Sequence, residues 1–321
     1  MIKEAPITFK PYLKDVIWGG NRICAYKGVR QETPNIGESW EISEVPGHES
    51  IVDDGEYAGL NLTELISRFG EELLGNPVYR KYHGKFPLLI KLIDAHDNLS
   101  VQVHPDDELA KIRHNSLGKT EMWYIIKTDD KAKIYAGLKK QITPSEYLER
   151  IESKTFAEIL AEHESSPGDV FFLPAGRVHA IGAGNLLAEI QESSDVTYRI
   201  YDYDRVDADG NTRELHTQLA KDAIDYKVYD NYKNPPLPEG VKDYEMVNCN
   251  HFSVRRLIID GEKDFELSKD SFTVIMCIDG FVHIRCKEGE TLLSKGKTAL
   301  LPANINKFKI EGIATLIVAR S

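Results

Sequence analysis

The sequence predicts a mainly β fold, built as two barrel-like units with a few helices packed against them. Three observations support this prediction. Short β-branched or aromatic runs recur at close intervals, helical patterns are few, and one pattern of glycine, apolar strand and proline turn occurs twice. Closely spaced strands separated by turn residues are typical of β-sandwiches and barrels, whereas a regular alternation of strands and helices would indicate a parallel sheet.

Six segments carry the strand prediction, and turn residues separate them. They are 87–93 (PLLIKLI), 122–127 (MWYIIK), 169–174 (DVFFLP), 196–203 (VTYRIYDY), 272–278 (FTVIMCI) and 315–319 (TLIVA). Three helices are predicted, at 62–74, 143–160 and 213–225. The second begins with Thr143, Pro144 and Glu146, which fit an N-cap, a first-turn proline and a capping-box glutamate. We expect these helices to act as scaffold on the outside or at one end of the β core.

The segment 229–240 contains three prolines and little apolar content, so it is predicted to be an interdomain linker. The chain would then divide into an N-terminal unit at 1–228, which holds the helices, and a strand-rich C-terminal unit at 241–321. A chain of 321 residues is long enough for two such units.

An internal repeat links the two units. GDVFFLPAG starts at Gly168 and GKTALLPAN starts at Gly296, and each combines a turn glycine, an apolar strand and a proline-led turn. The first copy continues to His179, whereas Lys307 occupies the equivalent position after the second. This difference predicts a duplicated β-barrel that keeps its chemistry in one copy only.

Charge and composition exclude several classes of partner. The chain has 40 Lys and Arg against 51 Asp and Glu, a formal charge of −11, which argues against nucleic acid or an anionic membrane but allows a local basic pocket for a small anion. We find no signal-peptide pattern and no run of about eighteen apolar residues. Four cysteines lack the paired spacing of zinc or redox motifs, so we expect a reduced, cytoplasmic protein; they are Cys24, Cys249, Cys277 and Cys286.

The stretch LSVQVHPDDE carries an unexpected polar face. Ser100, Gln102 and His104 lie on one side of a strand because side chains alternate along it. Glu121 begins the next strong β-run and His179 follows a third, so Gln102, His104, Glu121 and His179 are expected to meet at one end of a barrel. Two imidazoles, a carboxylate and an amide oxygen suit an ion such as Zn²⁺ with one open position. Spacing alone also fits histidines that only satisfy core hydrogen bonds.

Two longer motifs resemble those of a known superfamily. GDVFFLPAGRVH has the form of the second cupin motif, and QVH followed by Glu121 resembles the first, with Gln102 in place of a histidine and a longer gap. LSVQVHPDDELA, GKTEMWYII and SSDVTYRIYDYDR look like the active-site segments of the type I mannose-6-phosphate isomerase family, in its shorter bacterial form. The resemblance also covers WGG (18–20) and GESWEIS (37–43) and extends through the C-terminal unit.

This resemblance implies two cupin-type jelly-roll barrels. The N-terminal unit would be the catalytic cupin domain with a helical insertion, and the C-terminal unit a degenerate cupin domain. It also implies one zinc ion per chain in the N-terminal barrel, with Gln102, His104, Glu121 and His179 as ligands. The implied reaction interconverts mannose 6-phosphate and fructose 6-phosphate by proton transfer through an enediol(ate), so the expected partner is a small sugar phosphate.

The resemblance further implies two catalytic residues. Arg199 matches the family arginine near the metal, and its permanent charge suits stabilisation of negative charge better than service as a base. Lys119 matches the lysine of the K-x-E segment, although Thr120 replaces the proline of longer members. Lys119 would move a proton if burial and zinc depress its pKa, or it would hold phosphate; a metal-bound water is the other candidate for proton transfer.

Three more residues match positions that line the same pocket and are predicted to bind substrate. Ser100 and Lys91 are candidates for contacts to hydroxyls or phosphate, and Asp195 is a candidate for orienting Arg199. The acidic segment DYDR (202–205) is predicted to be structural, with Arg205 paired to a neighbouring aspartate.

Two other functions fit parts of the pattern. An Fe(II) cupin oxygenase would also use two histidines and a carboxylate, but Gln102, Lys119 and Arg199 favour sugar-phosphate chemistry. A non-catalytic sugar-binding or regulatory cupin would keep the pocket without the activity. The intact ligand set together with Arg199 argues against that alternative.

Overall fold

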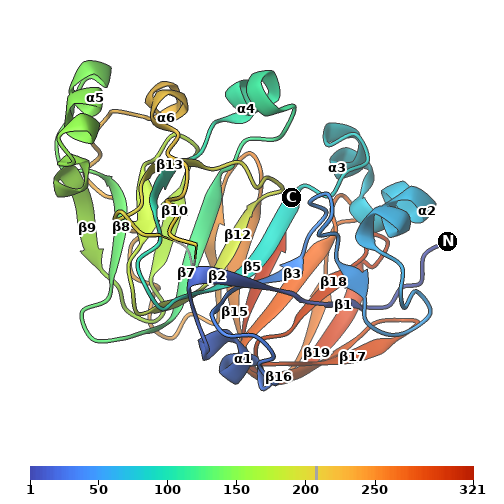
Figure 1. Ribbon diagram of the computed structural model, residues 1–321. Helices are drawn as coiled ribbons and strands as arrows, with labels where there is room; N and C mark the ends of the chain where they lie inside the picture. The colour runs from blue at the N-terminus through green and yellow to red at the C-terminus, as the bar shows by residue number, and fades with distance from the viewer. Residues whose placement is uncertain (207–208) are drawn as a thin grey trace.

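The computed structural model describes residues 1–206 and 209–321, and its antiparallel sheets form three layers (Figure 1). The middle sheet has the order β10 (Val170–Leu173), β7 (Glu121–Thr128), β12 (Asn185–Glu192), β5 (Leu88–Ala95), β3 (Ile36–Ile42) and β2 (Tyr12–Gly20). A five-stranded sheet on one side has the order β13 (Tyr198–Tyr201), β6 (Val101–Val103), β11 (His179–Ile181), β8 (Lys133–Leu138) and β9 (Leu160–Glu164). All six predicted strand segments are confirmed.

The third sheet is formed mainly by the C-terminal part of the chain. Its order is β14 (Asp243–Asn248), β15 (Ser253–Glu266), β19 (Lys307–Arg320), β16 (Thr273–Arg285), β18 (Thr298–Leu301), β1 (Ile7–Lys10) and β4 (Ile51–Val52), with β17 (Glu290–Ser294) beside β16. Because β1 pairs with β18, the two ends of the chain share one sheet. The division at 1–228, 229–240 and 241–321 stays a prediction.

Apolar side chains fill the space between the layers. Trp123 and Phe171 of the middle sheet pack with Ile134 and Ile181 of the five-stranded sheet. On its other face, the middle sheet shares one large apolar cluster with the third sheet, and the rings of Phe86 and Phe272 lie 4.6 Å apart in it. The two parts of the chain are therefore held together by a common core.

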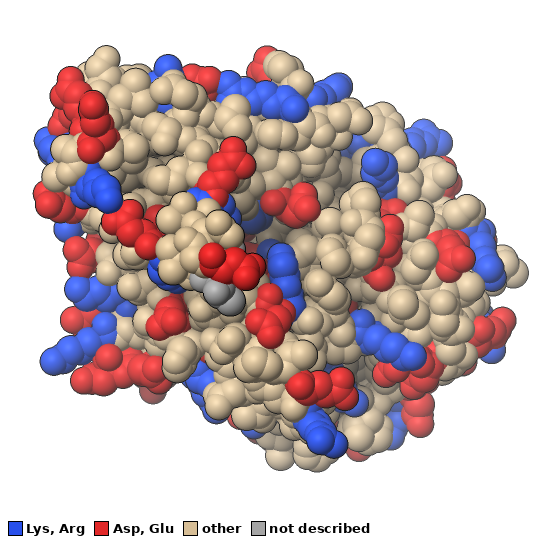
Figure 2. Space-filling view, in the orientation of Figure 1, with Lys and Arg blue, Asp and Glu red and all other residues tan. Residues whose placement is uncertain are grey.

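The third sheet also encloses a core of its own. Leu257, Ile275, Leu293, Leu301 and Leu316, from five different strands, belong to one buried cluster. This cluster contains apolar side chains from strands that pair within the third sheet. Acidic and basic side chains are interspersed over the face of the molecule shown in Figure 2.

The helices lie at the ends and edges of the sheets (Figure 1). They are α1 (Arg22–Lys27), α2 (Leu62–Leu74), α3 (Asn76–Lys81), α4 (Asp107–His114), α5 (Pro144–Glu152) and α6 (Thr217–Ala223), with a 3₁₀ turn at Phe156–Ile159. The predicted helix 62–74 is confirmed, with a kink at Gly70, and the predicted helix 213–225 is shorter than expected. Within the described ranges, no helix is both long enough and apolar enough to cross a membrane.

The prediction of one helix over 143–160 is wrong in its second half. Thr143 caps the helix as predicted, because its side chain accepts the Glu146 N–H at 3.1 Å. The helix ends after Glu152: the Ser153 hydroxyl donates to a carbonyl of the last turn, and Lys154 has a positive φ of 56°. A left-handed residue cannot continue a right-handed helix, so the chain turns there and enters β9.

The internal repeat is confirmed as a structural repeat. Gly168 and Gly296 both have positive φ values, 91° and 78°, which glycine adopts without strain. Each precedes a short strand and a turn, and β11 and β19 then begin at the equivalent residues His179 and Lys307. His179 is 1% exposed, whereas Lys307 is exposed at the surface, so the equivalent residues of the two copies differ in burial.

The shared core generates a stability prediction. We expect Phe272→Ala to lower the free energy of unfolding by about 3–5 kcal/mol, because it leaves a cavity where the two parts of the chain meet. Phe281→Ala is the matched control, since Phe281 is 54% exposed on β16 and its loss should cost under about 0.5 kcal/mol. Denaturant unfolding of both variants provides the measurement. Equal losses would show that Phe272 does not join the two parts.

Candidate metal centre and substrate pocket

A row of side chains crosses the five-stranded sheet. His179 on β11 lies opposite Gln102 on β6, and Gln102 lies opposite Arg199 on β13. Residues directly opposite each other on antiparallel strands point to the same face, so these three side chains are neighbours. Strand register alone therefore brings together two predicted ligands and the predicted catalytic arginine.

A second row crosses the middle sheet. Trp123 on β7 lies opposite Glu189 on β12, which lies opposite Lys91 on β5, and Lys91 lies opposite Trp40 on β3. The ring of Trp123 lies 5.3 Å from the ring of His179, so the two rows face each other between the sheets.

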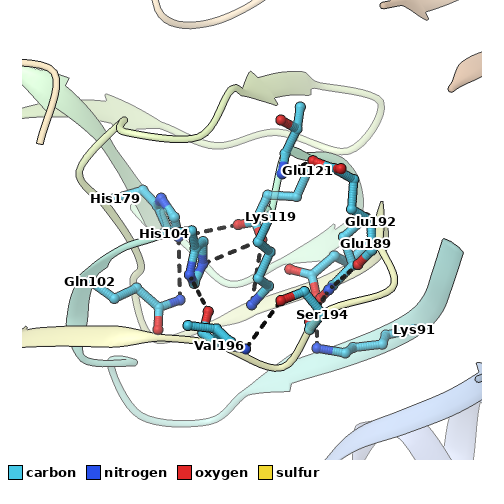
Figure 3. Close-up of polar contacts among 12 residues, drawn as sticks. Lys91, Gln102, His104, Lys119, Glu121, His179, Glu189, Glu192, Ser194 and Val196 are labelled. Carbon is cyan, nitrogen blue, oxygen red and sulfur yellow. Dashed lines mark hydrogen bonds and ion pairs between the residues drawn. The ribbon is translucent and has the colours of Figure 1, made fainter. Parts of the chain in front are cut away.

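The predicted ligands meet where these rows approach each other (Figure 3). Glu121 Oε1 lies 3.1 Å from His179 Nε2, and Glu121 Oε2 lies 3.5 Å from His104 Nε2. The side-chain nitrogen of Gln102, Nε2, is 3.3 Å from His179 Nε2. His104, Glu121 and His179 are each at most 1% exposed, and their ligand atoms all lie within 4.8 Å of one another.

Hydrogen bonds on the far side of each imidazole fix its tautomer. His104 Nδ1 donates to Val196 O at 3.0 Å, and His179 Nδ1 donates to Arg177 O at 2.9 Å. A carbonyl only accepts, so Nδ1 carries the proton and Nε2 presents its lone pair to Glu121. This arrangement is typical of metal-binding histidines, which donate their second nitrogen to a backbone carbonyl.

Three of the atoms that converge on this point have no hydrogen-bond partner. Within the described residues, His104 Nε2 and both Glu121 carboxylate oxygens are buried and unpaired. Burial lowers the pKa of His179 to about 4 and the pKa of His104 well below its usual value, so both rings are neutral near pH 7. Buried electron pairs that face each other need a positive charge between them, and nitrogen and carboxylate donors suit a divalent metal ion.

A cavity of about 320 Å³ opens beside this cluster. The predicted site residues that line it are Lys91, Ser100, Gln102, Lys119, Asp195 and Arg199. Two of the other three predicted ligands contact this lining, because His179 reaches Gln102 and Glu121 lies 3.7 Å from Lys119 Nζ. The third, His104, lies 3.5 Å from Glu121. The structure therefore brings all nine predicted site residues into one place.

Comparisons with known proteins agree with this geometry. A family model described as the catalytic domain of type I phosphomannose isomerase matches residues 7–120, and one described as the cupin domain of mannose-6-phosphate isomerase matches residues 242–321. The chain is 37% identical over 329 residues to mannose-6-phosphate isomerase ManA of Bacillus subtilis, covering 98% of both chains. The chain belongs to the mannose-6-phosphate isomerase family.

Other relatives of the enzyme support the same assignment. A mannose-6-phosphate isomerase from Streptococcus mutans is 33% identical over 317 residues, with 98% of each chain covered. The crystal structure of mannose 6-phosphate isomerase from Bacillus subtilis superposes with a TM-score of 0.89 at 35% identity, covering 98% of this chain and 99% of that one. The mainly β, cupin-type fold expected from the sequence is thus confirmed.

Buried charges in the pocket of the enzyme alternate in sign. Lys91 Nζ lies 3.1 Å from Glu189 Oε1 and 3.6 Å from Glu38 Oε2. Burial opposes the charge of Lys91, but Glu189 and Glu38 outweigh it and raise the pKa of Lys91 above its usual range. In contrast, burial lowers the pKa of Lys119 and raises the pKa of Glu121 to about 8.

The structure adds pocket residues that the sequence did not predict. Glu38, Trp40 and Glu189 line the cavity, and the Trp123 indole donates to Glu189 at 2.7 Å. Glu189 was recognisable in principle, since it is an acidic residue within the apolar run NLLAEIQE. Trp40 is 2% exposed, and Lys91 Nζ lies 5.3 Å from the centre of its ring.

Arg199 is held by the chain that follows it. Its Nη1 donates to Glu214 O at 2.8 Å, and its backbone N–H donates to His216 Nδ1 at 3.1 Å. Within the described residues Arg199 Nε is buried without a hydrogen-bond partner. Asp195 lines the same cavity, but its role in orienting Arg199 stays a prediction.

Asp202 yields a prediction about pH and stability. The expected pairing of Arg205 with a nearby aspartate is confirmed, since Arg205 binds Asp202 at 2.5 Å; Arg213, which lines the cavity, donates to Asp202 from Nε at 2.7 Å. Burial opposes ionisation of Asp202, but Arg213 and Arg205 outweigh it and lower its pKa. We expect Asp202→Asn to cost about 2 kcal/mol near pH 7, because hydrogen bonds to charged groups are lost.

The sign of this effect follows from the lowered pKa. The contacts of ionised Asp202 with its two arginines contribute fully to the free energy of unfolding above the pKa of Asp202 in the unfolded chain, which is 3.8. This contribution disappears as the pH falls through the pKa of Asp202 in the folded protein. Denaturant unfolding of both proteins between pH 7 and pH 3 would measure the difference. A difference that grows on acidification would contradict the assignment.

Proposed function

We propose that the enzyme interconverts mannose 6-phosphate and fructose 6-phosphate with one zinc ion held by Gln102, His104, Glu121 and His179. The observation that carries this proposal is the convergence of unpaired His104 Nε2 and Glu121 oxygens beside the cavity. Gln102 would contribute its amide oxygen, the atom of that group which binds cations, after the amide turns over, because Nε2 is the atom that faces His179 here. Membership of the isomerase family supplies the reaction.

The aldose–ketose shift moves a proton from C2 to C1 and places negative charge on oxygen in the enediol(ate). A bound divalent ion would supply Lewis-acid polarisation of the sugar carbonyl. Arg199 lines the cavity with a buried, unpaired Nε–H, so it is suited to stabilise the developing charge. Its guanidinium remains protonated and would not act as the base.

Lys119 is the proposed carrier of the proton. It is 6% exposed, it lies in the cavity wall beside Glu121, and burial lowers its pKa. A lowered pKa makes the neutral form of a lysine, which general base catalysis requires, easier to reach. Lys119 is therefore better suited to proton transfer than Lys91, whose pKa is raised.

The remaining polar groups are proposed to bind the sugar. The charge of Lys91 is already balanced by Glu38 and Glu189, so its ammonium is suited to hydroxyl groups more than to a phosphate dianion. Ser100 is 5% exposed in the cavity wall and offers a hydroxyl contact. Asp195 is proposed to accept from a substrate hydroxyl or from Arg199.

Metal removal tests the proposed cofactor. The wild type should contain about one zinc per chain by elemental analysis, should lose coupled mannose 6-phosphate isomerase activity with a chelator, and should regain it with zinc. His179→Ala should lose the metal and the activity, whereas His96→Ala, which changes an exposed histidine of the same unit, should keep both. Full activity of metal-free protein would refute zinc dependence, and iron-dependent oxygen uptake would indicate an oxygenase.

Substitution of Arg199 tests the proposed charge stabilisation. Arg199→Ala should keep its metal but lose about 10²–10³-fold in kcat, the usual cost of removing one donor to a developing oxyanion. Arg199→Lys keeps the charge without the Nε–H and should recover only part of the loss. The coupled assay and elemental analysis supply the measurements. Unchanged turnover in Arg199→Ala would remove this residue from the mechanism.

A further inference from the structure

The turn between β14 and β15 brings the C-terminal part of the chain close to the catalytic segment. A backbone hydrogen bond from Cys249 closes the turn. The Ser321 hydroxyl donates to His251 O at 2.9 Å, and Lys81 Nζ of α3 donates to Asn250 O at 2.5 Å. Hairpin turns usually lie at the surface without such contacts. The hydrogen bonds from Ser321 and Lys81 therefore fix the position of this turn relative to the rest of the fold.

The side chain of His251 reaches a buried carboxylate of the middle sheet. His251 Nδ1 lies 2.9 Å from Glu192 Oε1 and 3.9 Å from Asp107 Oδ2. Glu192 is 1% exposed at the end of β12. The contact with Glu192 raises the pKa of His251, with burial and Lys81 opposing and Asp107 adding to the effect. His251 thus places a ring nitrogen against a buried carboxylate from another sheet.

The same carboxylate holds the catalytic segment. Glu192 Oε2 accepts the Thr120 N–H at 2.7 Å, and the Glu192 N–H donates to Thr120 O at 3.1 Å. Thr120 lies between Lys119, the proposed proton carrier, and Glu121, the proposed metal ligand. A shift of Glu192 would therefore move the two residues on which the chemistry depends (Figure 3).

We propose that His251 is a positioning residue for the isomerase reaction: through Glu192 and Thr120 it holds Lys119 and Glu121 in place. The C-terminal unit would then form part of the active-site support, in addition to sharing a core with the catalytic unit. This inference rests on the proposed isomerase function.

A matched pair of variants tests the contact. In asparagine, Nδ2 is bonded to Cγ as Nδ1 is in histidine, so His251→Asn keeps a donor near Glu192, whereas His251→Leu has similar size and no donor. We expect His251→Leu to lose about tenfold in kcat, with KM within about twofold and metal content unchanged, because misplaced groups slow the chemical step. His251→Asn should keep most of the turnover.

Two controls separate positioning from general damage. His283→Leu makes the same change at a half-buried histidine on β16 of the same unit, and it should leave kcat and thermal stability unchanged. In a Glu192→Gln background, His251→Leu should add little further loss, because both residues act through one contact.

Hydrogen exchange provides a readout that does not depend on activity. In His251→Leu, the peptide covering residues 118–122 should exchange faster, while peptides of the third sheet should not change. Equal kcat in the leucine variant and the wild type, or equal losses in the leucine and asparagine variants, would each overturn the proposal. An inactive wild type would refute the isomerase function, and unchanged exchange at 118–122 would refute the positioning role independently.

Discussion

The enzyme depends on the meeting of neutral imidazole nitrogens and a carboxylate at one buried point. His104 Nε2, His179 Nε2 and the Glu121 oxygens all present electron pairs there, and backbone carbonyls behind the rings keep the protons on the opposite nitrogens. Such a cluster is unfavourable without a positive charge, whether a proton or a metal ion. The raised pKa of Glu121 has the same origin, since burial and Glu189 disfavour its anion.

Strand register maintains this arrangement. One row across the five-stranded sheet joins His179, Gln102 and Arg199, and a second across the middle sheet joins Glu189 and Lys91. A slip of one residue would turn every one of these side chains to the other face of its sheet. The apolar cores on both faces of the middle sheet oppose such a slip, so the stability of the fold and the geometry of the site have the same physical basis.

Two neighbouring lysines beside the candidate metal centre have pKa values that are shifted in opposite directions. Lys91 lies between two carboxylates and keeps its proton, whereas burial lowers the pKa of Lys119 beside Glu121. Buried ions cost free energy unless they are paired, which explains why each of these lysines has an acidic neighbour. The third sheet has a buried apolar cluster of its own, and it contributes to the site through the shared core and the turn that carries His251.

The sequence by itself determined the strand-rich class and the repeat at Gly168 and Gly296, and it predicted nine site residues, whose roles stay predictions. These features lie within short contiguous motifs, whose spacing does not depend on how distant segments pack. The break at Lys154 was missed because the helical pattern of 143–160 continues past it. The helix ends there because Lys154 has a left-handed backbone conformation.

Only the tertiary structure decided the partners of those residues. Glu38, Glu189 and Lys91 lie on β3, β12 and β5, far apart in sequence, and the order of strands in the middle sheet brings them into one network. His251 and Glu192 come from different sheets and meet through the packing of a turn. A motif predicts which groups can do chemistry, but their charge states and positions depend on burial and on neighbours that the fold supplies.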